Sequence, residues 1–92
     1  MEFETLFDDK KTLYSIRNED NEKSTITIDK WAADLLQEML PNVHDWIQLK
    51  YDLVCEKRPQ LSRREKGDLV RLLARKEAEN NPRYQSLIDQ FI

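Results

Sequence analysis

Residues 12–28 read TLYSIRNEDNEKSTITI, and this stretch decides the fold class of the chain. Its two ends, residues 12–17 and 24–28, alternate polar with apolar side chains and are rich in β-branched and aromatic residues, which is typical of strands with one buried face. The polar segment between them, residues 18–23, is rich in turn formers. The pattern predicts a β-hairpin over residues 11–29. Its inward face would carry Tyr14, Ile16, Ile26 and Ile28.

A two-stranded hairpin is barely stable alone in water, so it must pack on helices or on another chain. Apolar residues recur at helical spacing after the hairpin, throughout residues 30–92. Asp29 and Asn42 are expected to cap the first two helices, and Pro41 and Pro59 mark helix ends. We therefore predict a mainly α (α+β) fold, with an N-terminal β-hairpin followed by three or four short helices.

The second of these helices is expected to lie at the centre of the core, because little polar surface remains on two of its sides. Its main apolar stripe comprises Val43, Trp46, Ile47, Tyr51, Val54 and Cys55. Leu49 and Leu53 broaden that stripe.

The third helix has the strongest start signal in the chain, because Ser62 followed three residues later by Glu65 is a capping box. Gly67 in its second turn has two interpretations, tight helix packing or close approach of a ligand backbone. Asn81 and Pro82 open a last helix. Its apolar stripe, expected to seal the core or a dimer interface, comprises Tyr84, Leu87, Ile88 and Phe91.

Ninety-two residues make one domain, here residues 1–92, and its charged share of 36% leaves a thin core. A thin core favours a partner subunit, so we predict a homodimer. Residues 1–10 read as an arm that alternates acids with Phe3, Leu6 and Phe7, which are expected to dock on the domain or on a partner.

The composition excludes most catalytic chemistry. One cysteine, Cys55, forms no internal disulfide and reads as a small buried hydrophobe. On a continuous helix, His44 would stand three turns away from it, too far for a catalytic pair. A single His and a single Cys do not build a zinc site. Without a glycine-rich phosphate motif or a nucleophile elbow, the chain is predicted to be no enzyme and to hold no metal or cofactor.

No stretch approaches the ~20 apolar residues of a membrane span. The N-terminus is acidic and lacks the basic start and apolar run of a signal peptide. We therefore expect a cytoplasmic protein without membrane contact.

Positive charge is concentrated in one segment of a chain whose net charge is -3: residues 57–76 hold eight Lys or Arg and two Asp or Glu. Arg63, Arg64 and Lys66 lie in the first turn of the third helix, and Arg71 and Arg75 continue along one face of it. Three interpretations are open. This basic segment binds phosphate, binds an acidic protein, or is a solvated face that pairs with acidic segments of the same chain.

Residues 24–29 followed by an amphipathic helix, and Leu61 to Glu65 followed by Leu69-Val70-Arg71, resemble parts of ribbon-helix-helix DNA-binding proteins. The resemblance implies a homodimeric transcription regulator. It implies that Thr25 and Thr27 face DNA while Ile26 and Ile28 face the core, and that Ser62 and Arg63 hold the DNA backbone.

The leading functional hypothesis is a small dimeric nucleic-acid-associated regulator or accessory protein that contacts phosphate through its basic helix. The alternative is a protein-binding inhibitor or adaptor that makes no nucleic-acid contact. The predicted nucleic-acid-binding residues are Thr25, Thr27, Ser62, Arg63, Arg64, Lys66, Arg71 and Arg75.

Overall fold

The computed structural model describes residues 10–90, and within them the predicted α+β architecture is confirmed. Two strands come first, β1 (Lys11–Arg17) and β2 (Lys23–Asp29). The helices that follow are α2 (Lys30–Met39), α3 (Val43–Lys57), α4 (Arg63–Ala78) and α5 (Pro82–Asp89). The predicted docking of Phe3, Leu6 and Phe7, and the place of Phe91 in the last stripe, lie outside the described residues.

The hairpin has the predicted pairing and the predicted inward face. β1 and β2 are antiparallel, with Tyr14 opposite Ile26 and Ile16 opposite Ser24. Ile16, Ile26 and Ile28 are buried, and Tyr14 packs half-buried against them. Because cross-strand partners point to the same side of a sheet, the alternate residues form a second, outer face that points away from the core.

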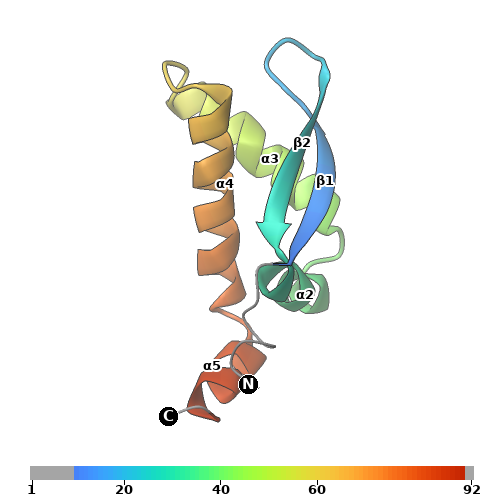
Figure 1. The fold of residues 1–92 in the computed structure, drawn as a ribbon, viewed down its shortest axis with the longest axis vertical. Helices are drawn as coiled ribbons and strands as arrows, with labels where there is room; N and C mark the ends of the chain where they lie inside the picture. Colours follow the sequence, from blue (N-terminus) through green and yellow to red (C-terminus); the bar gives the residue numbers. More distant parts are fainter. Residues whose placement is uncertain (1–9, 91–92) are drawn as a thin grey trace.

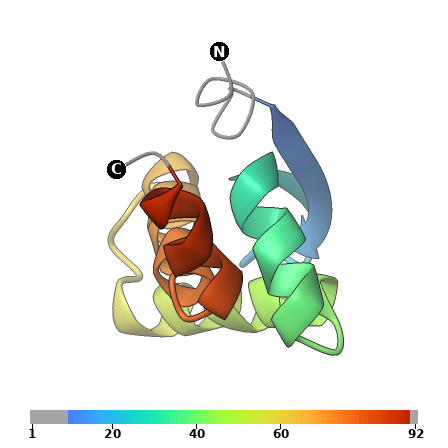
Figure 2. The ribbon, with the colours of Figure 1, turned by 90° about the horizontal axis from the view of Figure 1, so that it is seen from below.

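The helices cover the inner side of the hairpin and lie along both of its edges. α3 crosses behind the hairpin and α4, while α4 runs beside β2 and α2 lies at the base of the hairpin (Figures 1 and 2). The core lies where these elements meet. Its fully buried large side chains are Ile28, Leu36, Ile47 and Val70.

The structure corrects the expected breadth of the α3 stripe. Val43, Ile47 and Tyr51 are buried, but Leu49 is 62% exposed and Leu53 is 36% exposed. The hairpin, α4 and α2 pack on this helix, but they leave its side at Leu49 and Leu53 uncovered. α3 is therefore an amphipathic helix at the back of the core, with two leucines facing outward.

The predicted helix starts are confirmed for α3 and α5. Asn42 accepts a hydrogen bond from the Asp45 amide, and Asn81 accepts one from the Arg83 amide. Asn81 is also buried and donates its side-chain amide to the Leu35 carbonyl at 3.0 Å, which ties α5 to α2.

Two other local expectations are wrong. Asp29 occupies the N-cap position of α2 but its side chain makes no capping hydrogen bond, because its carboxylate is held by Lys11 and Arg75. Tight packing does not explain Gly67 either, since a Cβ atom at this position would meet no heavy atom within 4 Å.

The capping box at the start of α4 is confirmed in both directions. The Glu65 amide donates to Ser62 Oγ at 3.1 Å, and the Ser62 amide donates to Glu65 Oε1 at 3.0 Å. The amides of Ser62 and Glu65 at the start of α4 therefore have acceptors within the chain.

Replacing Ser62 with alanine is expected to lower the free energy of unfolding by about 0.5–2 kcal/mol, because the Glu65 amide loses its acceptor. The measurement is the urea midpoint at constant m-value. Ser86→Ala, an exposed helical serine whose hydroxyl has no partner among the described residues, is the control and should change stability by less than about 0.5 kcal/mol. Equal midpoints for the two variants would contradict a stabilising role for the Ser62 cap.

None of the helices within residues 10–90 is long and apolar enough to cross a membrane.

Candidate functional site

The cations predicted on α4 all lie on that helix, but most of them are paired with acidic residues of the same chain. Arg63 forms ion pairs with Glu19 and Asp20 in the hairpin turn. Lys66 is only 3% exposed, and its ammonium donates to Glu19 Oε2 at 2.7 Å. The turn of the hairpin and the first turn of α4 are therefore joined by charge.

Glu19 is the centre of this charge cluster. Besides Lys66 and Arg63, it accepts a hydrogen bond from the Tyr51 hydroxyl on α3 at 2.7 Å. The hydrogen bond from Lys66, followed by that from Tyr51, lowers the pKa of Glu19 to about 2. Burial, and then the hydrogen bond to Glu19, raise the pKa of Tyr51. One carboxylate thus links the hairpin, α3 and α4.

The remaining two cations of the helical row lie along β2. Arg71 pairs with Asp68 and donates to both the carbonyl and the hydroxyl of Thr27, at 3.4 and 3.3 Å. Arg75 pairs with the buried carboxylate of Asp29. Burial alone would raise the pKa of Asp29, but hydrogen bonds from Arg75 and Lys11 outweigh it and hold that pKa below its ordinary value.

Arg64 differs from these four cations. It is exposed and forms no ion pair with any residue that the structure describes. Together with Arg63, Arg71 and Thr25 it lines a cleft of about 190 Å³ between β2 and α4. Of the strand residues predicted to face DNA, Thr25 is exposed on the outer face of the hairpin, whereas Thr27 is half-buried beside Arg71.

Two exposed cations on the hairpin itself were missed by the sequence analysis. Arg17 stands directly opposite Lys23 at the turn end of the strands, and neither forms an ion pair within residues 10–90. Like charges directly opposite each other destabilise a strand pair. The signal was available in the hairpin register, which follows from the predicted strands.

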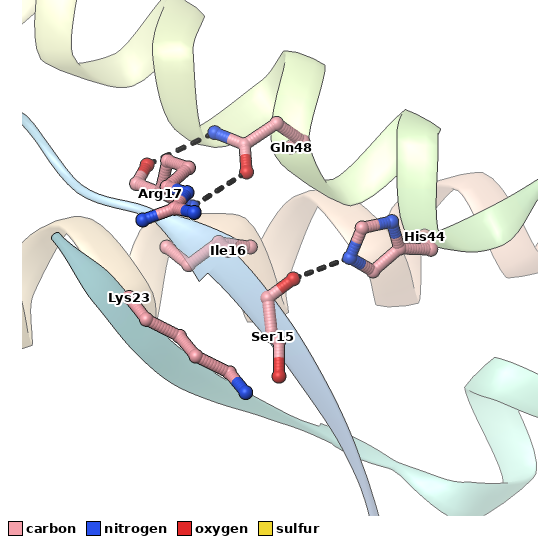
Figure 3. A pocket seen from close by; sticks show the side chains of 6 residues that line it. All are labelled: Ser15, Ile16, Arg17, Lys23, His44 and Gln48. Carbon is pink, nitrogen blue, oxygen red and sulfur yellow. Dashed lines mark hydrogen bonds between the residues drawn. The ribbon is translucent and has the colours of Figure 1, made fainter. Parts of the chain in front are cut away.

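Arg17 and Lys23 line a pocket of about 280 Å³ between β1 and α3, together with Ser15, Ile16, His44 and Gln48 (Figure 3). The side chain of Gln48 accepts from the Arg17 amide at 2.7 Å and donates to the Arg17 carbonyl at 3.0 Å. His44 donates a ring N–H to the Ser15 carbonyl. Two α3 side chains thereby bind the outer edge of β1, as a neighbouring strand would.

Cys55 and His44 do not form a joint site. Cys55 is half-buried beside Tyr51, and burial raises the pKa of its thiol. The described part of the chain holds no group of three or more His, Cys, Asp or Glu residues that could bind a metal ion.

Comparison with protein-family models, with curated proteins and with solved structures found no match for this chain.

Proposed function

We propose that this chain is a small nucleic-acid-associated regulator or accessory protein that contacts DNA with the outer face of its hairpin and with Arg64 of α4. The observation that carries the proposal is the chemistry of that face. Its exposed side chains are cations, hydroxyls and one leucine, in a chain with a net charge of -3: Lys11, Leu13, Ser15, Arg17, Lys23 and Thr25.

The one carboxylate at an outer-face position of the strands, Asp29, is buried and neutralised by Lys11 and Arg75. A two-stranded ribbon fits the major groove of duplex DNA, where hydroxyls contact base edges and cations contact phosphates. Thr25 would then contact bases, whereas Arg64 beside it would contact the DNA backbone.

In this proposal α4 contributes fewer DNA contacts than the sequence alone suggested. The charges of Arg63, Lys66, Arg71 and Arg75 are balanced by carboxylates of the chain, so each adds less to phosphate affinity than a free cation. The homodimer and the relation to ribbon-helix-helix proteins stay predictions. The hairpin pairs two strands of one chain, whereas that family pairs one strand from each of two chains.

The proposal is tested by fluorescence anisotropy, in which binding to a labelled DNA duplex is measured between roughly 50 and 200 mM salt. Over this range the affinity should fall about 10-fold for every two phosphates that the protein contacts. Replacing Arg64 with glutamine is expected to reduce the log–log salt slope by about 0.9, because one phosphate contact is lost. Lys76→Gln removes the same charge from an exposed α4 position outside the cleft and should leave the slope unchanged. Thr25→Ala should change the preference among duplex sequences more than the slope.

Undetectable binding by the unmutated protein at low ionic strength would contradict the proposal, as would binding that does not depend on salt. Equal slopes for Arg64→Gln and Lys76→Gln would remove Arg64 from the interface.

The second candidate function is a protein-binding inhibitor or adaptor, and it is favoured by the apolar surface of α3. Leu49 and Leu53 lie one turn apart on this helix and are both exposed, and Leu72 of α4 is 55% exposed. Exposed large apolar side chains that gather on one side of a helix are typical of surfaces that bind another protein. Absence of DNA binding in the salt series would make this function the leading one.

A further inference from the structure

The pocket between β1 and α3 has a fixed wall. His44 binds the Ser15 carbonyl, and Gln48 binds both the amide and the carbonyl of Arg17, so the edge of β1 is held against α3 at two alternate residues (Figure 3). Ile16, between them, is buried in the core. The side chains that rise from this stretch of β1 therefore start from a restrained backbone.

Uncompensated positive charge faces this pocket. The only side-chain hydrogen bond that Arg17 makes within the described chain is to the Asn21 carbonyl at 3.3 Å, which leaves most guanidinium donors free. Lys23 makes none there, and its side chain extends across the strands towards Ser15 (Figure 3). No carboxylate belongs to the lining, whereas Arg63, Lys66, Arg71 and Arg75 of α4 each have an acidic partner.

We propose that this pocket binds one phosphate group. The Arg17 guanidinium would hold two phosphate oxygens in its planar fork, the Lys23 ammonium would add a point charge from the neighbouring strand, and the Ser15 hydroxyl would donate to a further oxygen. A phosphate group suits this set because it offers three acceptor oxygens and negative charge to donors supplied by two neighbouring strands. A bound phosphate also removes the repulsion between Arg17 and Lys23 across the hairpin.

The proposal deepens the nucleic-acid function proposed above, since a backbone phosphate of DNA is one source of the group and free phosphate is the other. The first experiment needs no DNA. Inorganic phosphate is titrated into the ¹⁵N-labelled protein, and sodium chloride at matched ionic strength is titrated in parallel. We expect the amide chemical shifts of Ser15, Arg17 and Lys23 to change and reach a plateau with phosphate but not with chloride.

The double variant Arg17→Gln/Lys23→Gln should abolish the saturating shifts, while its dispersed amide spectrum reports that it is folded. Lys57→Gln/Lys76→Gln removes the same net charge from exposed positions outside the pocket and should retain them. The proposal is overturned if chloride produces the same shifts, or if the two double variants respond alike.

The second experiment identifies the source of the phosphate. If a DNA phosphate occupies the pocket, Arg17→Gln/Lys23→Gln reduces the salt slope on duplex DNA by about 0.9, as expected for one phosphate. An unchanged slope together with saturable inorganic phosphate assigns the pocket to a free phosphate. Saturable phosphate in a protein that does not bind DNA contradicts the nucleic-acid function and leaves the pocket standing.

Discussion

Replacing Ile47 with alanine is expected to lower the free energy of unfolding by about 2–5 kcal/mol, because the deleted methyl and methylene groups leave a cavity that the surroundings refill only partly. Ile47 is fully buried on the side of α3 that faces the hairpin and α4. A loss of this size is a large fraction of the total stability of a small domain, about 5–15 kcal/mol. The measurement is chemical denaturation followed by the far-ultraviolet circular dichroism signal.

Leu49→Ala provides the matched control, since Leu49 is two residues away on the same helix and 62% exposed. Apart from the small gain in helix propensity that alanine brings, this substitution should change the free energy of unfolding by less than about 0.5 kcal/mol. If Ile47→Ala does not fold at all, Ile47→Val keeps the test quantitative, with an expected loss of about 0.5–1.5 kcal/mol. Similar losses at positions 47 and 49 would mean that α3 does not pack with the described face inward.

The elements of this fold that could be predicted from the sequence are those specified by local patterns. Alternation over residues 12–17 and 24–28 predicted the strands and their inward face, because side chains alternate along a strand whatever covers it. Ser62 with Glu65, and Asn81 before Pro82, predicted helix starts, because their hydrogen bonds close within a few residues.

The parts that could not be predicted depend on contacts between distant residues. Pairing of the basic segment with the chain's own acids was one of three interpretations, but nothing local assigns Glu19 to Lys66, 47 positions away. Nor does helical periodicity reveal that only one side of α3 is covered, which is why Leu49 was placed in the core. Only one part of the pocket at Arg17 could be predicted. The strand register places Arg17 opposite Lys23, but it does not reveal that α3 packs beside them.

Replacing Glu19 with glutamine is expected to lower the free energy of unfolding by about 2–3 kcal/mol, because the buried Lys66 ammonium loses its counter-charge. Breaking a buried ion pair by removing one partner typically costs about 3–5 kcal/mol. The loss is smaller here because the Glu19 side chain is 31% exposed while that of Lys66 is 4% exposed.

Lys66→Met is the informative counterpart, since an apolar side chain of similar length replaces the buried ammonium. Glu19 then keeps Tyr51 and Arg63 as partners and retains contact with water, so we expect a change within about 1 kcal/mol in either direction. The double variant Glu19→Gln/Lys66→Met should be more stable than Glu19→Gln alone. If Lys66→Met is as damaging as Glu19→Gln, the cost arises from packing of the lysine stem and not from an unpaired charge.

The pH dependence of the free energy of unfolding further separates a loss of charge pairing from a loss of lysine packing. The pKa of Glu19 is lowered from its ordinary value of 4.5 to about 2 in the folded chain, so the folded state binds its proton less readily than the unfolded state does. The stability that the carboxylate contributes is therefore fully present above pH 4.5 and is lost as the pH falls towards 2. The difference in urea midpoint between the unmutated protein and Glu19→Gln should shrink over this range, whereas the contribution of Asp29, present in both proteins, cancels. A difference that is the same at pH 7 and pH 2.5 would show that the charge on Glu19 does not stabilise the fold.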